Sequence, residues 1–94
     1  MTDIPEPEVF SVEGHQIRGY ELLKRIVSRA NKSSGRIVVP VDWVGTSVKV
    51  VIGGEVYDDY VKPGVNQGRL NVKIEYVQKP AWIVRIDPIS DNYL

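Results

Sequence analysis

The chain contains no cysteine and only one histidine among its 94 residues. Without cysteine it can form neither a disulfide framework nor a thiolate zinc site, and it has no cysteine nucleophile. The single histidine, His15, follows a glycine in a turn-like sequence, where a surface role is expected rather than catalysis or metal ligation. The composition fits a reducing compartment. We therefore expect a cytoplasmic protein with no metal and no cofactor.

Long hydrophobic runs are also missing. The apolar stretches at 37–39 and 50–52 are far too short to span a bilayer, and the acidic start lacks the basic residues of a signal peptide. Hydrophobic residues nevertheless make up 43% of the chain and charged residues 26%, values typical of a folded domain. One domain of this length buries only about 60 to 65% of its unfolded surface, so burial against a second chain would help.

The formal net charge is zero, which argues against nucleic-acid binding unless the charges are segregated. They are. Residues 1–13 carry acidic side chains and no basic one, whereas 17–36 form a basic stripe with Glu21 as its only acid. The basic residues of this stripe are Arg18, Lys24, Arg25, Arg29, Lys32 and Arg36. Charge blocks of this size also arise by chance in small domains, so the stripe alone does not decide the function.

Catalytic motifs are absent from the sequence. Ser33 and Ser34 lack the context of a nucleophile elbow and are typical of a hinge beside glycine. The acidic group at 55–59 lacks the glycine and the spacing of a calcium loop. The remaining glycines fit turns rather than a phosphate-binding loop. We therefore expect no enzymatic activity, no small-molecule substrate and no membrane association.

Hydrophobic periodicity predicts a mainly β fold. Residues 1–8, with two prolines among acids, are predicted to be a flexible leader, and a short strand and turn follow from Val9. The segment 21–30 is ambiguous, because its apolar residues fall at helical spacing but also fit a two-sided strand.

The most ordered pattern lies at 33–52. Gly35 permits a chain reversal, a short strand ends at Pro40, and a turn carrying Trp43 is closed by Gly45 before an alternating strand at 47–52. Gly53 and Gly54 then form a two-residue hairpin signal, which returns the chain through 55–61.

The last third predicts a second hairpin. Alternating apolar residues from Leu70 to Tyr76 are followed by a turn at 78–80 and a strand at 81–86. The Gly- and Pro-containing segment 62–68 is the best internal boundary. We detect no internal repeat. The predicted organisation is a leader at 1–8, a β domain at 9–62, a hairpin at 63–87 packed on that domain, and a tail at 88–94.

The order of short elements between Gly19 and Ile52 resembles the swapped-hairpin unit of AbrB-like DNA-binding proteins. The resemblance is closest to small archaeal transposon-encoded proteins of unknown function. The matching residues are Gly19-Tyr20-Glu21, Ser34-Gly35-Arg36-Ile37, Pro40, Trp43, Gly45 and Val48-Lys49-Val50. Two departures, Val41-Asp42 after the proline and Thr46-Ser47 after the glycine, remove basic residues that the family usually carries. The resemblance favours a strand at 21–30.

The resemblance implies an interleaved homodimer that binds double-stranded DNA, as a transcription regulator or as an accessory protein of a mobile element. The implied dimer core consists of Ile37, Val39, Trp43, Val48, Val50 and Ile52, and the expected DNA-binding residues are Arg25, Arg29, Lys32 and Arg36. The alternative is a β-rich dimerisation or protein-interaction module without DNA binding, in which Tyr57, Tyr60, Tyr76 and Trp82 form the interface. In a less favoured reading, these aromatics stack on single-stranded nucleic acid.

Overall fold

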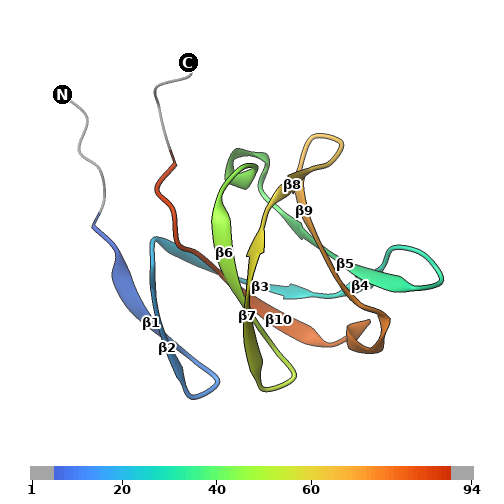
Figure 1. The fold of residues 1–94 in the computed structure, drawn as a ribbon, viewed down its shortest axis with the longest axis horizontal. Helices are drawn as coiled ribbons and strands as arrows, with labels where there is room; N and C mark the ends of the chain where they lie inside the picture. Colours follow the sequence, from blue (N-terminus) through green and yellow to red (C-terminus); the bar gives the residue numbers. More distant parts are fainter. Residues whose placement is uncertain (1–5, 90–94) are drawn as a thin grey trace.

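A computed structural model describes residues 6–89 and shows an all-β fold with two short 3₁₀ turns (Figure 1). The expected mainly β class is confirmed. The leader and tail predicted at 1–8 and 88–94 fall largely outside the described residues, although the first strand already begins at Glu8. The elements are β1 (Glu8–Val12), β2 (His15–Gly19), β3 (Glu21–Ile26), β4 (Ser28–Arg29), β5 (Ser34–Val39), η1 (Val41–Trp43), β6 (Ser47–Ile52), β7 (Glu55–Tyr60), β8 (Lys62–Pro63), β9 (Gly68–Lys73), η2 (Ile74–Tyr76) and β10 (Pro80–Arg85).

The strands form two four-stranded antiparallel sheets and one hairpin. One sheet has the order β3-β10-β6-β7, the other has the order β4-β5-β9-β8, and β1 pairs with β2. Only Val27 separates β3 from β4, and only Val61 separates β7 from β8, so two bent strands join the sheets at both edges. In Figure 1 the hairpin lies at one end of the long axis and the sheet β4-β5-β9-β8 lies toward the other.

The ambiguous segment 21–30 is extended, as the resemblance favours. β3 pairs with β10 from Glu21 to Ile26, and its alternate residues face two different clusters. Leu23 packs on the main core, whereas Leu22 packs on a second cluster on the other side of the sheet. A strand with two apolar faces has apolar residues at adjacent positions. Pairs of adjacent apolar residues also fit the i, i+3, i+4 spacing of a helix, which is why the pattern was ambiguous.

The structure contains an internal repeat, which the sequence did not reveal. Residues 35–52 align with 68–85 without a gap, so that β5-η1-β6 corresponds to β9-η2-β10. The preceding strands β3 and β7 also correspond. We call residues 21–52 the first half-unit and residues 55–85 the second half-unit. Trp43 corresponds to Tyr76, Asp42 to Glu75 and Ile37 to Leu70.

Strand pairing follows a pseudo-two-fold axis that relates the two half-units. The axis passes through the pair Ile37 and Leu70 in β5 and β9, and through the pair Val50 and Ile83 in β6 and β10. The register of β3 on β10 matches that of β7 on β6 residue by residue. The half-units interleave, because the first strand of the first half-unit pairs with the last strand of the second. Interleaving of half-units therefore occurs within this chain.

The expected C-terminal hairpin at 63–87 does not form. β9 pairs with β5 and β8, and β10 pairs with β3 and β6, so these two strands do not pair with each other. The alternation at 70–76 and the turn at 78–80 correctly indicated two strands and a turn, but not the strands with which they pair. A strand pattern specifies its buried face, whereas its neighbour in the sheet depends on contacts distant in sequence.

One main core fills the space between the sheets. It contains all six residues expected in a dimer core, each at most 1% exposed. It also contains residues of the second half-unit, among them Leu70, Val72, Ala81 and Ile83. The apolar side of the first half-unit is thus covered by the second half-unit of the same chain. A smaller cluster joins Val12 and Ile17 of the hairpin to Val51 and Val84 on the other face of the sheet.

We expect Gly35→Ala and Gly68→Ala to destabilise the protein similarly. A Cβ at Gly35 would lie 2.7 Å from Val27 Cγ1, and one at Gly68 would lie 2.6 Å from the equivalent atom of Val61. Each substitution should lower the free energy of unfolding by about 1 to 3 kcal/mol, the usual cost of overpacking. Urea denaturation measures this, with the exposed Asn71→Ala on β9 as a control. A large loss at only one of the two glycines would contradict the equivalence of the half-units.

We also expect unfolding to be independent of protein concentration. The core is closed within one chain, so association is not needed for folding. The thermal midpoint at low salt should therefore stay constant over about a hundredfold range of concentration, whereas the midpoint of an obligate dimer rises with concentration. A midpoint that climbs across this range would show that folding and association are coupled.

Candidate nucleic-acid interface

The outward side of the sheet β4-β5-β9-β8 carries basic side chains and no acidic one. Gly35, Ile37 and Val39 point inward, so their neighbours along β5 point outward, and β9 alternates in the same way. We call the outward residues of the two central strands, together with those opposite them on the edge strands, the basic face. It comprises Ser28, Ser34, Arg36, Val38, Lys62, Arg69, Asn71 and Lys73.

No residue of this sheet or of its connecting loops, 28–39 and 62–73, is acidic. The other sheet, in contrast, carries mixed charges. Within residues 6–89 the salt bridges join Lys49 to Asp58 at 2.6 Å and Arg85 to Glu21 at 3.5 Å, both on the sheet β3-β10-β6-β7. The basic side chains of the basic face form neither of these salt bridges. Zero net charge thus conceals a strongly positive surface on one sheet.

Arg36 and Arg69 occupy equivalent positions at the centre of the basic face. Arg36 lies opposite Asn71, and Arg69 lies opposite Val38, which makes the two arginines diagonal neighbours across β5 and β9. Diagonal Cβ atoms in such a pair are about 7 to 8 Å apart, a distance at which like charges repel without a counter-ion. The Nε atom of each arginine is buried and has no hydrogen-bond partner in residues 6–89, as is also true of Arg85 in the other sheet. The close approach of the two positive charges favours a bound anion.

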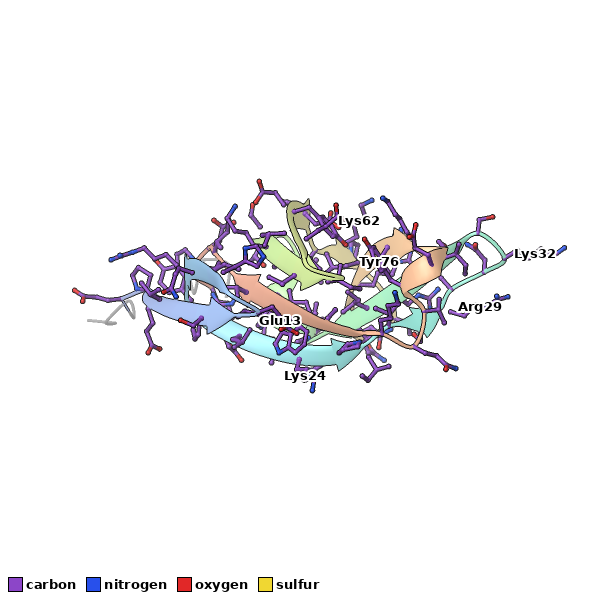
Figure 2. All side chains as sticks on the ribbon, turned by 90° about the horizontal axis from the view of Figure 1, so that it is seen from below. Glu13, Lys24, Arg29, Lys32, Lys62 and Tyr76 are labelled. Atoms are coloured by element: carbon purple, nitrogen blue, oxygen red, sulfur yellow. The ribbon has the colours of Figure 1, made fainter. Side chains whose placement is uncertain are left out.

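The four residues expected to contact DNA are distributed unequally. Arg36 lies on the basic face. Arg29 and Lys32 are exposed at the end of β4 and in the loop that follows. Arg29 lies opposite the inward-facing Gly35, so its side chain is on the other side of the sheet from Arg36. Figure 2 shows Lys32 at the tip of this loop, beyond the edge of the sheets. Arg25 lies on β3 in the other sheet. Its guanidinium donates to the carbonyl oxygens of Val38 at 3.1 Å and Lys24 at 3.0 Å, which is a structural role.

The basic residues of the second half-unit are not evident as a group in the sequence. Lys62, Arg69 and Lys73 are spread through 62–73, where no basic run attracts attention. Strand pairing brings them to the face that carries Arg36. The usable signal was the repeated Gly-Arg-aliphatic sequence at 35–37 and 68–70, which places an arginine at the same position of two related strands.

The four aromatic residues of the alternative interface do not share one surface. Tyr57 packs on the main core, whereas Trp82 packs on the second cluster on the opposite side of the same sheet. Tyr76 is buried, and only Tyr60 is largely exposed, at 55%. Lys24 Nζ lies 5.4 Å from the centre of the Trp82 ring, which covers part of that ring.

The described residues line two of the surface hollows. One of about 320 Å³ is lined by Glu55, Val56, Tyr57, Asn71, Lys73 and Tyr76, between β7, β9 and η2. The other, about 400 Å³, is lined by Asp42, Val44, Gly45, Thr46, Asp87, Pro88 and Ile89. Asp87 is used structurally, because its Oδ2 accepts the backbone N–H of Ser47 at 2.8 Å. Residues 6–89 hold no group of three or more His, Cys, Asp or Glu side chains that could bind a metal ion.

Tyrosines at the first hollow have altered acidity. Burial, with contributions from the charge of Asp59 and from Tyr76, raises the pKa of Tyr57 to about 12. The hydroxyl of Tyr76 donates to Glu55 Oε2 at 2.9 Å, and this hydrogen bond raises the pKa of Tyr76. Both phenols are therefore neutral hydrogen-bond donors at physiological pH.

Comparison of the chain with profiles of protein families, with curated proteins and with solved structures gives no match. Among the described residues, no helix has the length and apolar character needed to cross a membrane.

We expect Tyr57 to make stability fall at high pH. The pKa of Tyr57 is about 12 in the folded protein and about 10 in the unfolded chain. The contribution of its neutral phenol to the free energy of unfolding is therefore complete below pH 10 and is lost as the pH rises toward 12. The thermal midpoint of the wild type should therefore fall more between pH 9.5 and 11 than that of Tyr57→Phe. The exposed Tyr60→Phe is the control and should follow the wild type. Parallel curves for all three proteins would contradict this expectation.

Proposed function

We propose that the protein binds double-stranded DNA through the basic face, and that the two half-units of one chain take the place of the two subunits of an AbrB-like dimer. The proposal rests mainly on the pair Arg36 and Arg69, brought together by β5 and β9 on a surface without acidic residues. The sequence resemblance supports the same class and suggests a regulator or an accessory protein of a mobile element.

The geometry suits phosphate binding. A phosphate oxygen beside each guanidinium would accept charge-assisted hydrogen bonds from it. The flanking lysines Lys62 and Lys73 add charge on either side of the pair, and Lys32 adds charge in the loop after β4. Contacts of this kind position a duplex without reading its sequence.

The expected test is a titration of labelled duplex DNA by fluorescence anisotropy across a range of salt. The double variant Arg36→Glu/Arg69→Glu should lose more than about tenfold in affinity at low salt. The slope of log affinity against log salt should fall by about 2, because each lost phosphate contact reduces it by about 1. The matched control is Arg18→Glu/Lys24→Glu, which changes the net charge equally at exposed positions outside the basic face.

An equal loss in both double variants would show that overall charge, rather than this face, governs binding. Unchanged affinity in Arg36→Glu/Arg69→Glu would contradict the proposal.

Arg25→Gln is a third variant, which distinguishes a DNA contact by Arg25 from its structural hydrogen bonds. Because its guanidinium is bonded to two carbonyl groups, the variant should lower the free energy of unfolding by about 1 kcal/mol and leave the salt slope unchanged.

A further inference from the structure

The hollow between β7, β9 and η2 adjoins the basic face. Two of its lining residues, Asn71 and Lys73, belong to that face, while Glu55, Val56 and Tyr57 come from β7 and Tyr76 comes from η2. In Figure 2, Tyr76 lies in the same half of the molecule as Lys62, Arg29 and Lys32. A nucleic acid lying on the basic face would therefore pass the opening of the hollow.

The walls combine aromatic rings with hydrogen-bonding groups. Tyr57 supplies a ring and a neutral hydroxyl, Glu55 supplies a carboxylate, and Asn71 supplies an amide. Tyr76 is buried, with Lys79 Nζ 5.9 Å from the centre of its ring, and contributes the wall that fixes Glu55. One oxygen of Glu55 accepts from Tyr76, and the hydrogen bonds of residues 6–89 use neither its other oxygen nor the Asn71 amide. Rings that stack and groups that both donate and accept are the means by which proteins hold an unpaired base.

The pseudo-symmetry shows that the fold does not require this polar set. The equivalent residues of the other half-unit are Glu21, Leu22, Leu23, Val38, Pro40 and Trp43, which are mostly apolar. There, Glu21 is paired with Arg85, and Arg25 bridges β3 to the carbonyl oxygen of Val38. Arg25 corresponds to Asp59, whose carboxylate instead accepts the N–H of Tyr60 at 2.7 Å. The space between β7 and β9 therefore lacks that bridge.

We propose that this hollow receives a single unpaired nucleobase of the bound nucleic acid. The inference rests on the proposed function, because the basic face would hold the neighbouring phosphates. A volume of about 320 Å³ lies at the small end of ligand pockets, which suits one or two fused rings. Lys73 links the two sites, since it lines the hollow and belongs to the basic face.

The test compares two duplexes of the same sequence, one fully paired and one with a single extrahelical 2-aminopurine. Anisotropy should show about fivefold or tighter binding of the second duplex, the lower end of what one stacked base contributes. The emission of 2-aminopurine should change at saturating protein. Tyr57→Leu, which introduces the residue found at the equivalent Leu23, and Glu55→Gln should both abolish the preference. Both should keep the wild-type affinity for the paired duplex. Glu21→Gln is the matched control and should keep the preference.

A second measurement separates the two proposals. Free adenosine and cytidine, at millimolar concentration, should shift the amide resonances of Tyr57 and Tyr76. Equal affinity for both duplexes, with no nucleoside-induced shifts, would overturn the nucleobase site and leave the basic face standing. Nucleoside-induced shifts in a protein that binds no duplex at low salt would support the site and overturn the proposed function. A protein that shows neither duplex binding nor nucleoside-induced shifts would overturn both the proposed function and the nucleobase site. Thermal midpoints identify any variant that fails to fold.

Discussion

The fold depends on strand pairing across the pseudo-two-fold axis. β5 pairs with β9, and β6 pairs with β10, with Ile37, Leu70, Val50 and Ile83 at the centres of these pairs and all at most 1% exposed. Neither half-unit contains a complete sheet, because β3 finds its partner in β10. The same pairing that closes the core also places Arg36 beside Arg69. Core and basic face are therefore the inner and outer sides of one arrangement of strands.

Local patterns in the sequence predicted the elements well. The turn at Gly53-Gly54, the turn carrying Trp43 and the strand at 47–52 are all present, because each depends on neighbouring residues. The pairing of the strands could not be predicted in this way, because it depends on residues that are distant in sequence. The repeat is also hidden, since most equivalent positions differ in residue identity, as with Trp43 and Tyr76 or Ile37 and Leu70. Interleaving was expected, but burial alone does not reveal whether the second half comes from another chain.

The two half-units share a backbone pattern but differ in surface charge. Lys24 and Arg25 on β3 correspond to Asp58 and Asp59 on β7, so one edge strand is basic and the other acidic. Arg36 and Arg69, in contrast, are the same residue type at the same position. Summing charge along the chain cancels these contributions, which explains why composition gave a neutral result. The strand topology shows which equivalent positions carry charges of the same sign and which carry charges of opposite sign.

This difference bears on how a duplex would be oriented. The central pair Arg36 and Arg69 is symmetric about the axis and would interact equally with a duplex in either direction, because both orientations present phosphates to the same arginines. The rest of the basic face is not symmetric, since Lys62 corresponds to Ser28 and Lys73 to Pro40. The positions between β3 and β5 that are equivalent to the lining of the hollow are mostly apolar, and Arg25 bridges these two strands. On the proposed function, the flanking lysines and the hollow would therefore distinguish the two orientations of a duplex, while the arginine pair would hold phosphates in both.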